Sequence, residues 1–252
     1  MPTPRLVAFD LDDTLAPSKS PLDPRMLETF ASLLAAVPVA VISGGNFQQF
    51  EQQLVRPLRE REGLVLDDLH LLPTCGTAYY RWSGSDWALQ YAEDLTDDEK
   101  ARALAAVEAQ AKAAGYWASE TWGEILEDRG SQITFSALGQ SAPVDVKKRW
   151  DPTGEKKDHL RRLVQAELPD LEVRSGGSTS VDITSKGIDK AYGMRRLAEL
   201  TGIPLDDMLF VGDRLDPEGN DYPVKALGVP CHAVAGWEDT DAFLTDLIPT
   251  LR

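Results

Sequence analysis

The chain has 252 residues, of which 42% are hydrophobic and 27% are charged, so it can bury the core of one large domain or of two modest ones. Its 41 acidic and 26 basic residues give a formal net charge of -15, which disfavours binding to nucleic-acid backbones and anionic membranes. No stretch approaches the ~20 apolar residues of a membrane helix, and no secretory leader is recognisable. Cys75 and Cys231 lie far apart and are interpreted as small buried hydrophobic residues. We therefore expect a cytoplasmic protein without nucleic-acid or membrane partners.

Three short apolar runs are typical of buried strands in a parallel sheet, namely Leu6–Phe9, residues 37–42 and Met208–Val211. Helical patterns follow these runs at residues 24–36, 47–61, 189–200, 220–227 and 239–247. The sequence therefore predicts an α/β fold, with a parallel sheet that helices cover on both faces.

The middle of the chain has a different rhythm. Residues 79–87 suggest two strands around a turn, and residues 96–114 suggest a helix whose Thr96 and Glu99 match a capping box. Further strands are expected at residues 124–126, 132–136, 171–173 and 180–184, with a second helix at residues 154–167. We interpret residues 82–185 as an inserted α+β cap, and residues 1–81 and 186–252 as a core domain that the insertion splits.

The strongest chemical signal is the segment from Asp10 to Thr14, which begins where an apolar strand ends. Ligands bind at such strand ends because the chain turns there and leaves a crevice. Ser43 follows the second apolar run and Asp213 follows the third, so adjacent parallel strands would bring Asp10, Ser43 and Asp213 to one edge of the sheet. Taken alone, the Asp12-Asp13 pair could also serve only to cap a turn.

Four carboxylates are expected in this small region: Asp10, Asp12, Asp213 and Asp221. They cannot all stay ionised in a small pocket without a counter-charge. Mg²⁺ suits a site of oxygen ligands, because it binds one or two carboxylates, water and a substrate phosphate. We therefore expect Mg²⁺ as the cofactor of these four residues.

Two further features could hold phosphoryl oxygens. Ser43 and Gly44 precede the helix expected at residues 47–61, where backbone N–H groups can approach an anion, although such residues are also routine helix caps. Lys190 stands in the first turn of another helix, where a cation opposes the helix dipole by up to about 1 kcal/mol. That cost favours a role beside a phosphoryl group, with a solvated lysine as the alternative.

Together these motifs resemble the four motifs of the haloacid dehalogenase superfamily, through Asp10 to Thr14, Ser43, Lys190 and the segment 212–221. The insert between the Ser43 and Lys190 motifs resembles that of type IIB members, which carry a large α+β cap. Within the superfamily the chain is most similar to eukaryotic-type phosphomannomutases, through residues 129–139, 176–182 and 187–192. The resemblance covers nearly the whole chain in order and spacing.

The resemblance implies phosphoryl transfer through an aspartyl-phosphate on Asp10, with Asp12 acting first as acid and then as base. Ser43 and Lys190 would hold the phosphoryl oxygens, and Mg²⁺ would bind Asp10, the Asp12 backbone carbonyl and Asp213. It also implies substrate-binding positions, which are Gly44, Lys19, Arg129, Ser180, Asp182 and Asn220. For Ser180 and Asp182, a half-exposed strand face is the alternative interpretation.

The cap departs from the mutase pattern. Trp122 and Gln140 stand where arginines are expected, and neither side chain offers the planar fork with which arginine binds phosphate. Lys19 replaces a further arginine near the first motif. We therefore favour a sugar-phosphate phosphatase, with a phosphomannomutase or phosphoglucomutase as the alternative and a non-catalytic sugar-phosphate-binding protein as a third hypothesis. The expected partner is a small phosphorylated sugar, and a homodimer through the cap is considered as well.

Overall fold

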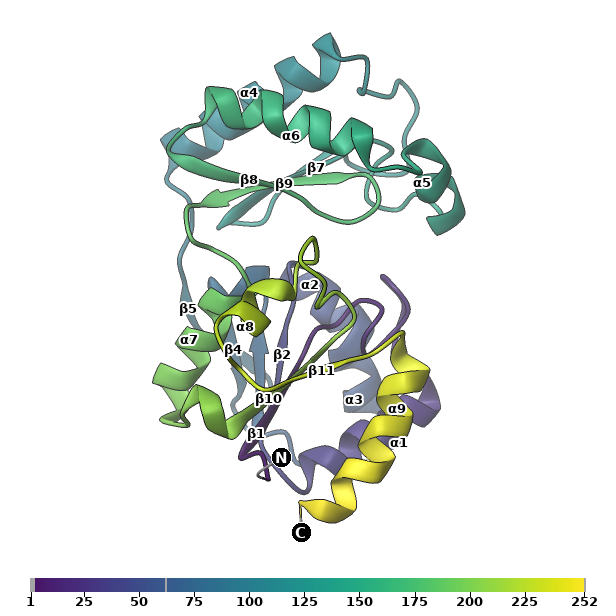
Figure 1. The fold of residues 1–252 in the computed structure, drawn as a ribbon, viewed down its shortest axis with the longest axis vertical. Helices are drawn as coiled ribbons and strands as arrows, with labels where there is room; N and C mark the ends of the chain where they lie inside the picture. Colours follow the sequence, from purple (N-terminus) through teal and green to yellow (C-terminus); the bar gives the residue numbers. More distant parts are fainter. Residues whose placement is uncertain (1–2, 62, 252) are drawn as a thin grey trace. The chain divides into compact units, whose positions relative to one another are not determined.

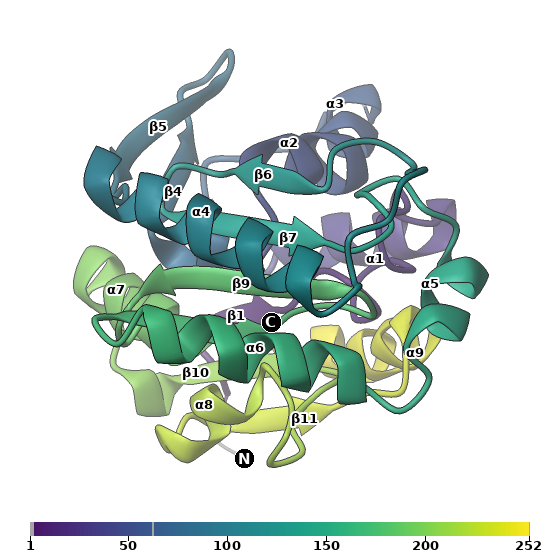
Figure 2. The same cartoon turned by 90° about the horizontal axis from the view of Figure 1, so that it is seen from above.

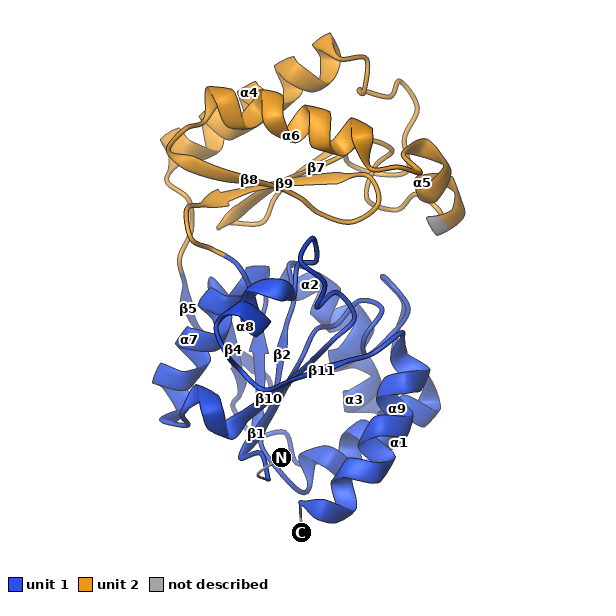
Figure 3. Cartoon of the chain, in the orientation of Figure 1, with its two compact units in different colours: residues 1–92, 189–252 blue, residues 93–188 orange. Residues whose placement is uncertain are grey.

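The computed structural model describes residues 3–61 and 63–251. The chain forms two compact units, one of residues 1–92 and 189–252 and the other of residues 93–188 (Figure 3). The first unit is discontinuous in sequence because the second is inserted into it. The structure starts the inserted unit at Glu93 rather than at residue 82, since the strand that precedes Glu93 pairs within the sheet of the first unit.

The first unit is built on a seven-stranded sheet in the order β11-β10-β1-β2-β3-β4-β5 (Figure 1). The neighbours from β11 to β3 are parallel, whereas β4 and β5 are added antiparallel at one edge. The strands are β1 (Leu6–Phe9), β2 (Val39–Ile42), β3 (Leu69–Leu72), β4 (Ala78–Trp82), β5 (Trp87–Ala92), β10 (Met208–Gly212) and β11 (Cys231–Ala233). The carboxyl ends of β1, β2 and β10 therefore lie side by side at one edge of the sheet.

Helices cover both faces of this sheet, as the apolar strand pattern predicts (Figure 1). Val7 and Phe9 of β1 face one hydrophobic cluster, whereas Leu6 and Ala8 face the other. The first cluster is covered by α1 (Pro24–Leu34), the continuous helical segment α2 (Phe47–Phe50), η1 (Glu51–Val55) and α3 (Arg56–Glu60), and α9 (Trp237–Leu247). The second cluster is covered by α7 (Lys190–Thr201) and α8 (Tyr222–Ala226).

The second unit is a four-stranded antiparallel sheet in the order β6-β7-β9-β8. Its strands are β6 (Leu126–Asp128), β7 (Gln132–Ser136), β8 (Leu171–Ser175) and β9 (Ser180–Ser185). The helices α4 (Asp97–Ala113) and α6 (Glu155–Glu167) lie on one face of this sheet, and both views show them there (Figures 1 and 2). A shorter helix, α5 (Val144–Trp150), precedes α6.

The predicted α/β class and the predicted helices of the core are confirmed, with ends displaced by a few residues. The capping box of α4 is present: Thr96 accepts a hydrogen bond from the Glu99 N–H, and Glu99 accepts one from the Thr96 N–H. The strands β3 and β11 and the helix α5 were not predicted from the sequence, and β6 begins two residues later than predicted. Both cysteines are free and half-buried rather than buried.

None of the helices in the described part of the chain has the length and apolar character that a membrane crossing requires.

His70 of β3 lies inside the first unit in a small polar cluster. Its Nδ1 is 2.8 Å from the Tyr79 hydroxyl, and the Arg81 guanidinium approaches the same ring. Burial, with a further contribution from the Arg81 charge, lowers the pKa of His70 to about 3. The ring is therefore neutral in the folded protein at pH values where it would carry a proton in the unfolded chain.

This lowered pKa gives a prediction for stability. At pH values between the folded pKa of His70 and its unfolded pKa of about 6.5, the unfolded chain binds one more proton at His70 than the folded protein does. The contribution of neutral His70 to the free energy of unfolding is therefore complete above about pH 6.5 and is lost as the pH falls. His70→Gln should therefore reduce the slope of the unfolding free energy against pH by about 1.4 kcal/mol per pH unit between about pH 5 and 6. Urea denaturation at several pH values measures this slope. Equal slopes for the two proteins in that window would contradict the prediction.

Candidate active site

The candidate site lies at the carboxyl edge of the seven-stranded sheet. Asp10 directly follows β1, and its N–H donates to the Val211 carbonyl of the neighbouring β10. Asp213 directly follows β10, and Ser43 directly follows β2. Because β1 lies between β2 and β10 and all three are parallel, these residues reach the same edge.

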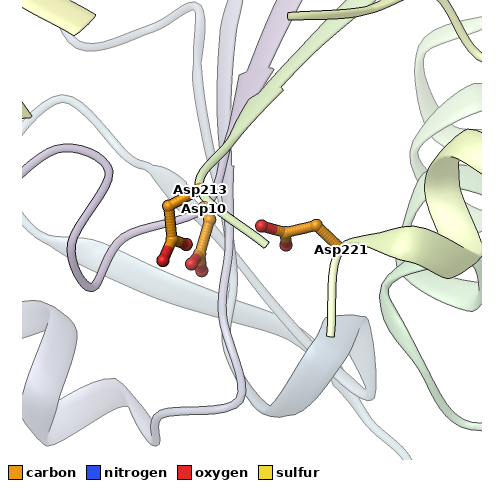
Figure 4. A group of neighbouring side chains, drawn as sticks. All are labelled: Asp10, Asp213 and Asp221. Carbon is orange, nitrogen blue, oxygen red and sulfur yellow. The ribbon is translucent and has the colours of Figure 1, made fainter. Parts of the chain in front are cut away.

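Three carboxylates meet at this edge (Figure 4). Asp10, Asp213 and Asp221 each offer one oxygen, and these oxygens all lie within 4.8 Å of one another. Asp221 comes from the residue before α8 and points toward the other two. The sequence separates these residues by up to 211 positions, so their meeting depends on the sheet order.

Lys190 supplies positive charge within this cluster. Its Nζ lies 2.6 Å from Asp10 Oδ1 and 2.5 Å from Asp221 Oδ1. The lysine is 1% exposed, so it is not the solvated lysine of the alternative interpretation. Three carboxylates and one ammonium group leave an excess of negative charge in a mostly buried place.

A close backbone approach positions Lys190. It is the first residue of α7, which Asp189 caps by accepting a hydrogen bond from the Tyr192 N–H. One turn further, a Cβ added to Gly193 would lie 2.7 Å from the Cys75 carbonyl oxygen, and one added to Gly76 would lie 2.6 Å from the Gly193 Cα. Two glycines therefore let α7 pack directly on the turn that follows β3.

The electrostatics of the cluster match a cation site. Burial raises the pKa of Asp10 well above its usual range, Lys190 lowers it in part, and Asp221 raises it again. Burial and the Asp221 charge likewise raise the pKa of Asp213. For Lys190, burial lowers the pKa, but the ion pairs with Asp10 and Asp221 outweigh it and keep the ammonium group charged. The surplus carboxylates resist ionisation until a further cation joins them, and oxygen-only ligands suit a hard divalent ion.

Gly212 makes room for Asp221. A Cβ at this position would lie 2.4 Å from Asp221 Oδ2 and 2.8 Å from the Phe210 ring. The same carboxylate oxygen accepts a hydrogen bond from the Arg214 N–H at 3.1 Å. Gly212 is therefore required because the buried Asp221 carboxylate packs directly against the end of β10.

The Asp12 carboxylate is bound by three donors of its own. Gln49 Nε2 donates to Oδ2 at 2.7 Å, whereas Gln53 Nε2 at 3.1 Å and the Lys19 N–H at 2.7 Å donate to Oδ1. The side chain of Asp12 is thus not among the three clustered carboxylates, and the predicted contact of Asp12 with a metal would run through its backbone carbonyl. The exposed Lys19 meets Asp12 through its backbone N–H.

Ser43 is buried, and its Oγ accepts a hydrogen bond from the Gly45 N–H at 3.2 Å. Its carbonyl accepts one from the Cys75 N–H, which ties the end of β2 to the turn after β3. Gly44 lies between Ser43 and the start of α2, in partly exposed backbone. Asn220, which precedes Asp221, is exposed.

The predicted cap residues lie in the second unit. Ser180 and Asp182 lie on the face of the sheet opposite α4 and α6, where Ser180 Oγ is 3.0 Å from Ser136 Oγ and Asp182 accepts a hydrogen bond from Thr134 at 2.8 Å. Arg129 donates to Glu127 at 2.6 and 2.8 Å, and its side chain is 8% exposed. Trp122, where an arginine was expected, is 45% exposed.

The first unit thus brings together five of the predicted residues at one edge: Asp10, Ser43, Lys190, Asp213 and Asp221. The contacts of Gln49 and Gln53 with Asp12 were not predicted from the sequence. Their spacing of four residues in a predicted helix was a signal, but Gln48 and Gln52 have the same spacing and are exposed.

Comparison with known proteins agrees with this arrangement. The model of the family "Eukaryotic phosphomannomutase" matches residues 26–250. The chain belongs to this family. It is 24% identical to a probable phosphomannomutase of Caenorhabditis elegans, over 98% of this chain and 96% of the relative. It is 27% identical to the phosphomannomutase of Saccharomyces cerevisiae, over 96% of this chain and 93% of the relative.

Solved structures support the haloacid dehalogenase fold. A haloacid dehalogenase-like hydrolase from Bacteroides thetaiotaomicron is similar with a TM-score of 0.63 at 16% identity, covering 96% of this chain and 99% of that one. An IMP-nucleotidase from Plasmodium falciparum in C-terminally truncated form gives a TM-score of 0.71 at 15% identity, covering 99% of this chain and 72% of that one. The predicted superfamily and its relation to the phosphomannomutases are therefore confirmed, and the chain is a haloacid dehalogenase-type enzyme.

The contact at Gly212 gives a prediction for stability. Gly212→Ala should lower the free energy of unfolding by about 1–3 kcal/mol, because the new methyl group overlaps the buried Asp221 carboxylate and the Phe210 ring. Chemical denaturation measures the change. Gly44→Ala is the matched control for stability, since its Cβ would meet no atom within 4 Å. An equal effect of the two substitutions would show that Asp221 moves at no cost.

Proposed function

We propose that this enzyme is a Mg²⁺-dependent sugar-phosphate mutase of the phosphomannomutase type. It would convert a hexose 1-phosphate into the 6-phosphate, or the reverse, through an aspartyl-phosphate on Asp10. The observation that carries this proposal is the extent of the family match, which runs from residue 26 to residue 250. The match therefore includes the whole inserted unit and the core from residue 26 onward. Relatives named phosphomannomutase cover 96–98% of the chain.

The residues of the first unit supply what phosphoryl transfer needs. Asp10 attacks the phosphorus, and the bond to the leaving sugar oxygen breaks as the bond to Asp10 forms. Asp12 gives its proton to that oxygen and later takes one from the acceptor hydroxyl. Lys190 and the Ser43 hydroxyl hold the phosphoryl oxygens, and the Lys190 ammonium offsets charge that develops on them. In a mutase, the phosphoryl group on Asp10 passes instead to the free hydroxyl of a hexose monophosphate. The bisphosphate that forms then returns its other phosphoryl group to Asp10, which leaves the isomeric monophosphate.

Two buried carboxylates and one half-buried carboxylate against one lysine fit a divalent cation, because their charge is otherwise unbalanced. In this proposal Asp10, Asp213, Asp221 and the Asp12 carbonyl hold Mg²⁺, which neutralises the phosphoryl oxygens when it is bound. The cap positions Arg129, Ser180 and Asp182, with Gly44, Lys19 and Asn220 of the core, are proposed to contact the sugar phosphate. A homodimer through the cap and a cytoplasmic location stay predictions.

A phosphatase remains the second candidate, and one observation favours it. A mutase must hold a bisphosphorylated intermediate, yet Trp122 and Gln140 stand where the resemblance leads us to expect arginines. The arginine that is present, Arg129, is paired with Glu127. In a phosphatase, water would accept the phosphoryl group instead of the sugar. Because the chain belongs to a family of enzymes, we set the non-catalytic hypothesis aside.

One assay separates the two candidates. The protein is incubated with Mg²⁺, mannose 1-phosphate and a trace of mannose 1,6-bisphosphate, which can phosphorylate Asp10 at the start. A mutase forms mannose 6-phosphate with little free phosphate, whereas a phosphatase releases phosphate and free sugar. Glucose 1-phosphate in a parallel reaction tests the sugar. Release of phosphate without isomer formation would overturn the mutase proposal.

A substitution tests the nucleophile. Asp10→Asn should reduce turnover of every phosphate ester to the background rate, because an amide does not attack phosphorus. Acid-quenched protein analysed by mass should carry a phosphoryl group in the wild type and none in the variant. Circular dichroism checks that the variant is folded. Turnover at the wild-type rate would exclude Asp10 as the nucleophile.

A second substitution tests the cap. Gln140→Arg should tighten binding of a hexose bisphosphate by about tenfold, because it restores a planar donor fork. Gln110→Arg, on helix α4 of the same unit, controls for the added charge. Isothermal titration calorimetry measures the affinity for the bisphosphate, and both arginine variants also carry Asp10→Asn so that the ligand is not turned over. Equal affinities in the two arginine variants would mean that residue 140 does not face the ligand.

A further inference from the structure

Asp12 is the centre of a small polar arrangement that the motifs do not predict. Two glutamine side chains, four residues apart on the helical segment after Ser43, both donate to its carboxylate. Gln49 binds Oδ2 and Gln53 binds Oδ1, so each oxygen has its own donor. Gln53 also lies in η1, a π-helical turn, and such turns often occur at functional sites.

We propose that Gln49 and Gln53 are positioning residues that fix the plane of the Asp12 carboxylate for proton transfer. This proposal rests on the proposed function, in which Asp12 gives a proton to the leaving oxygen. The terminal torsion of an aspartate is broad, so a carboxylate with one donor can still rotate. Donors on both oxygens stop that rotation, and proton transfer needs a geometry accurate to a fraction of an ångström.

The contacts around the two glutamines support a fixed arrangement. Gln53 is 1% exposed, and its Nε2 also donates to the Ser20 carbonyl at 3.1 Å, so its donor end is placed by two acceptors. The third donor to Asp12, the Lys19 N–H, belongs to the backbone next to Ser20. The Gln53 side-chain amide therefore links its helical segment to the Ser20 carbonyl and to the Asp12 carboxylate.

Gly45 leaves the space that the Gln49 amide occupies. A Cβ at Gly45 would lie 2.4 Å from Gln49 Oε1 and 2.7 Å from its Cδ. The atoms in the way are the far end of a flexible side chain, so Gly45→Ala would move the Gln49 amide rather than unfold the segment. The second glycine of the Ser43 motif is thus explained by the position of Gln49.

Two phosphoryl donors distinguish a loss of Asp12 orientation from general damage to the site. When a sugar phosphate phosphorylates Asp10, the bond from phosphorus to the sugar oxygen breaks and that oxygen receives the Asp12 proton. When acetyl phosphate phosphorylates Asp10, acetate leaves as a stable anion and needs no proton. Loss of Asp12 orientation should therefore slow the first reaction and spare the second.

The experiment uses Gln49→Met and Gln53→Met, because methionine keeps the length of the side chain and removes the donor. We expect kcat for the sugar phosphate to fall ten- to hundredfold with KM unchanged within about twofold. Phosphorylation of Asp10 by acetyl phosphate, measured by mass after acid quench, should stay within about twofold of the wild type. Gln48→Met and Gln52→Met, at exposed positions of the same helical segment, are the matched controls and should behave as the wild type.

Gly45→Ala provides an independent variant that leaves both glutamines in the chain. It should lower kcat as Gln49→Met does. The double variant with Gly45→Ala and Gln49→Met should be no slower than either single variant, because both substitutions remove the same contact between Gln49 and Asp12.

Two results would overturn the proposal. Either Gln49→Met and Gln53→Met turn over sugar phosphate like their controls, or phosphorylation by acetyl phosphate falls in proportion to kcat, which would indicate general damage to the site. A wild-type protein that turns over no phosphate ester would instead overturn the proposed function itself.

Discussion

The candidate site of the first unit depends on three carboxylates, two buried and one half-buried, that gather around one buried lysine. Asp10 and Asp221 both contact the Lys190 ammonium, and an Asp213 carboxylate oxygen lies within 4.8 Å of oxygens of both aspartates. Charges in such a place are stable only with close counter-charges. Several features of the unit follow from this need. Gly212 admits Asp221, and the close contact of Gly76 with Gly193 lets α7 bring Lys190 to the sheet edge.

The same imbalance connects the structure to chemistry. A cluster that holds surplus negative charge favours a divalent cation, and a bound cation together with Lys190 favours an anionic phosphoryl group. The Asp12 carboxylate instead accepts hydrogen bonds from Gln49 and Gln53, so the proposed nucleophile and the proposed acid and base have different partners. Two carboxylates two residues apart thus acquire different surroundings. Different surroundings are what allow two acids of one type to take different roles.

Much of the fold could be predicted from local sequence. The runs at β1, β2 and β10 are purely apolar, and the capping box of α4 was readable from Thr96 and Glu99. By contrast, β3 was missed because His70 interrupts its leucines, and this histidine is buried against Tyr79 and Arg81 from β4. The start of the inserted unit was placed too early because β5, which looks like part of the insertion, pairs with β4. Contacts with the neighbouring strand β4 decided both cases.

The sequence by itself determined the candidate reactive groups: an acidic motif at a strand end, a serine, a lysine in a first helical turn and a second acidic motif. Apolar runs and glycines mark such positions locally, so they can be recognised without a structure. Only the tertiary structure decided which groups meet. It placed Lys190 between Asp10 and Asp221, and it turned Gln49 and Gln53 toward Asp12 while leaving Gln48 and Gln52 exposed. The reason is physical, because four glutamines of identical chemistry differ only in the direction that the packed helical segment gives them.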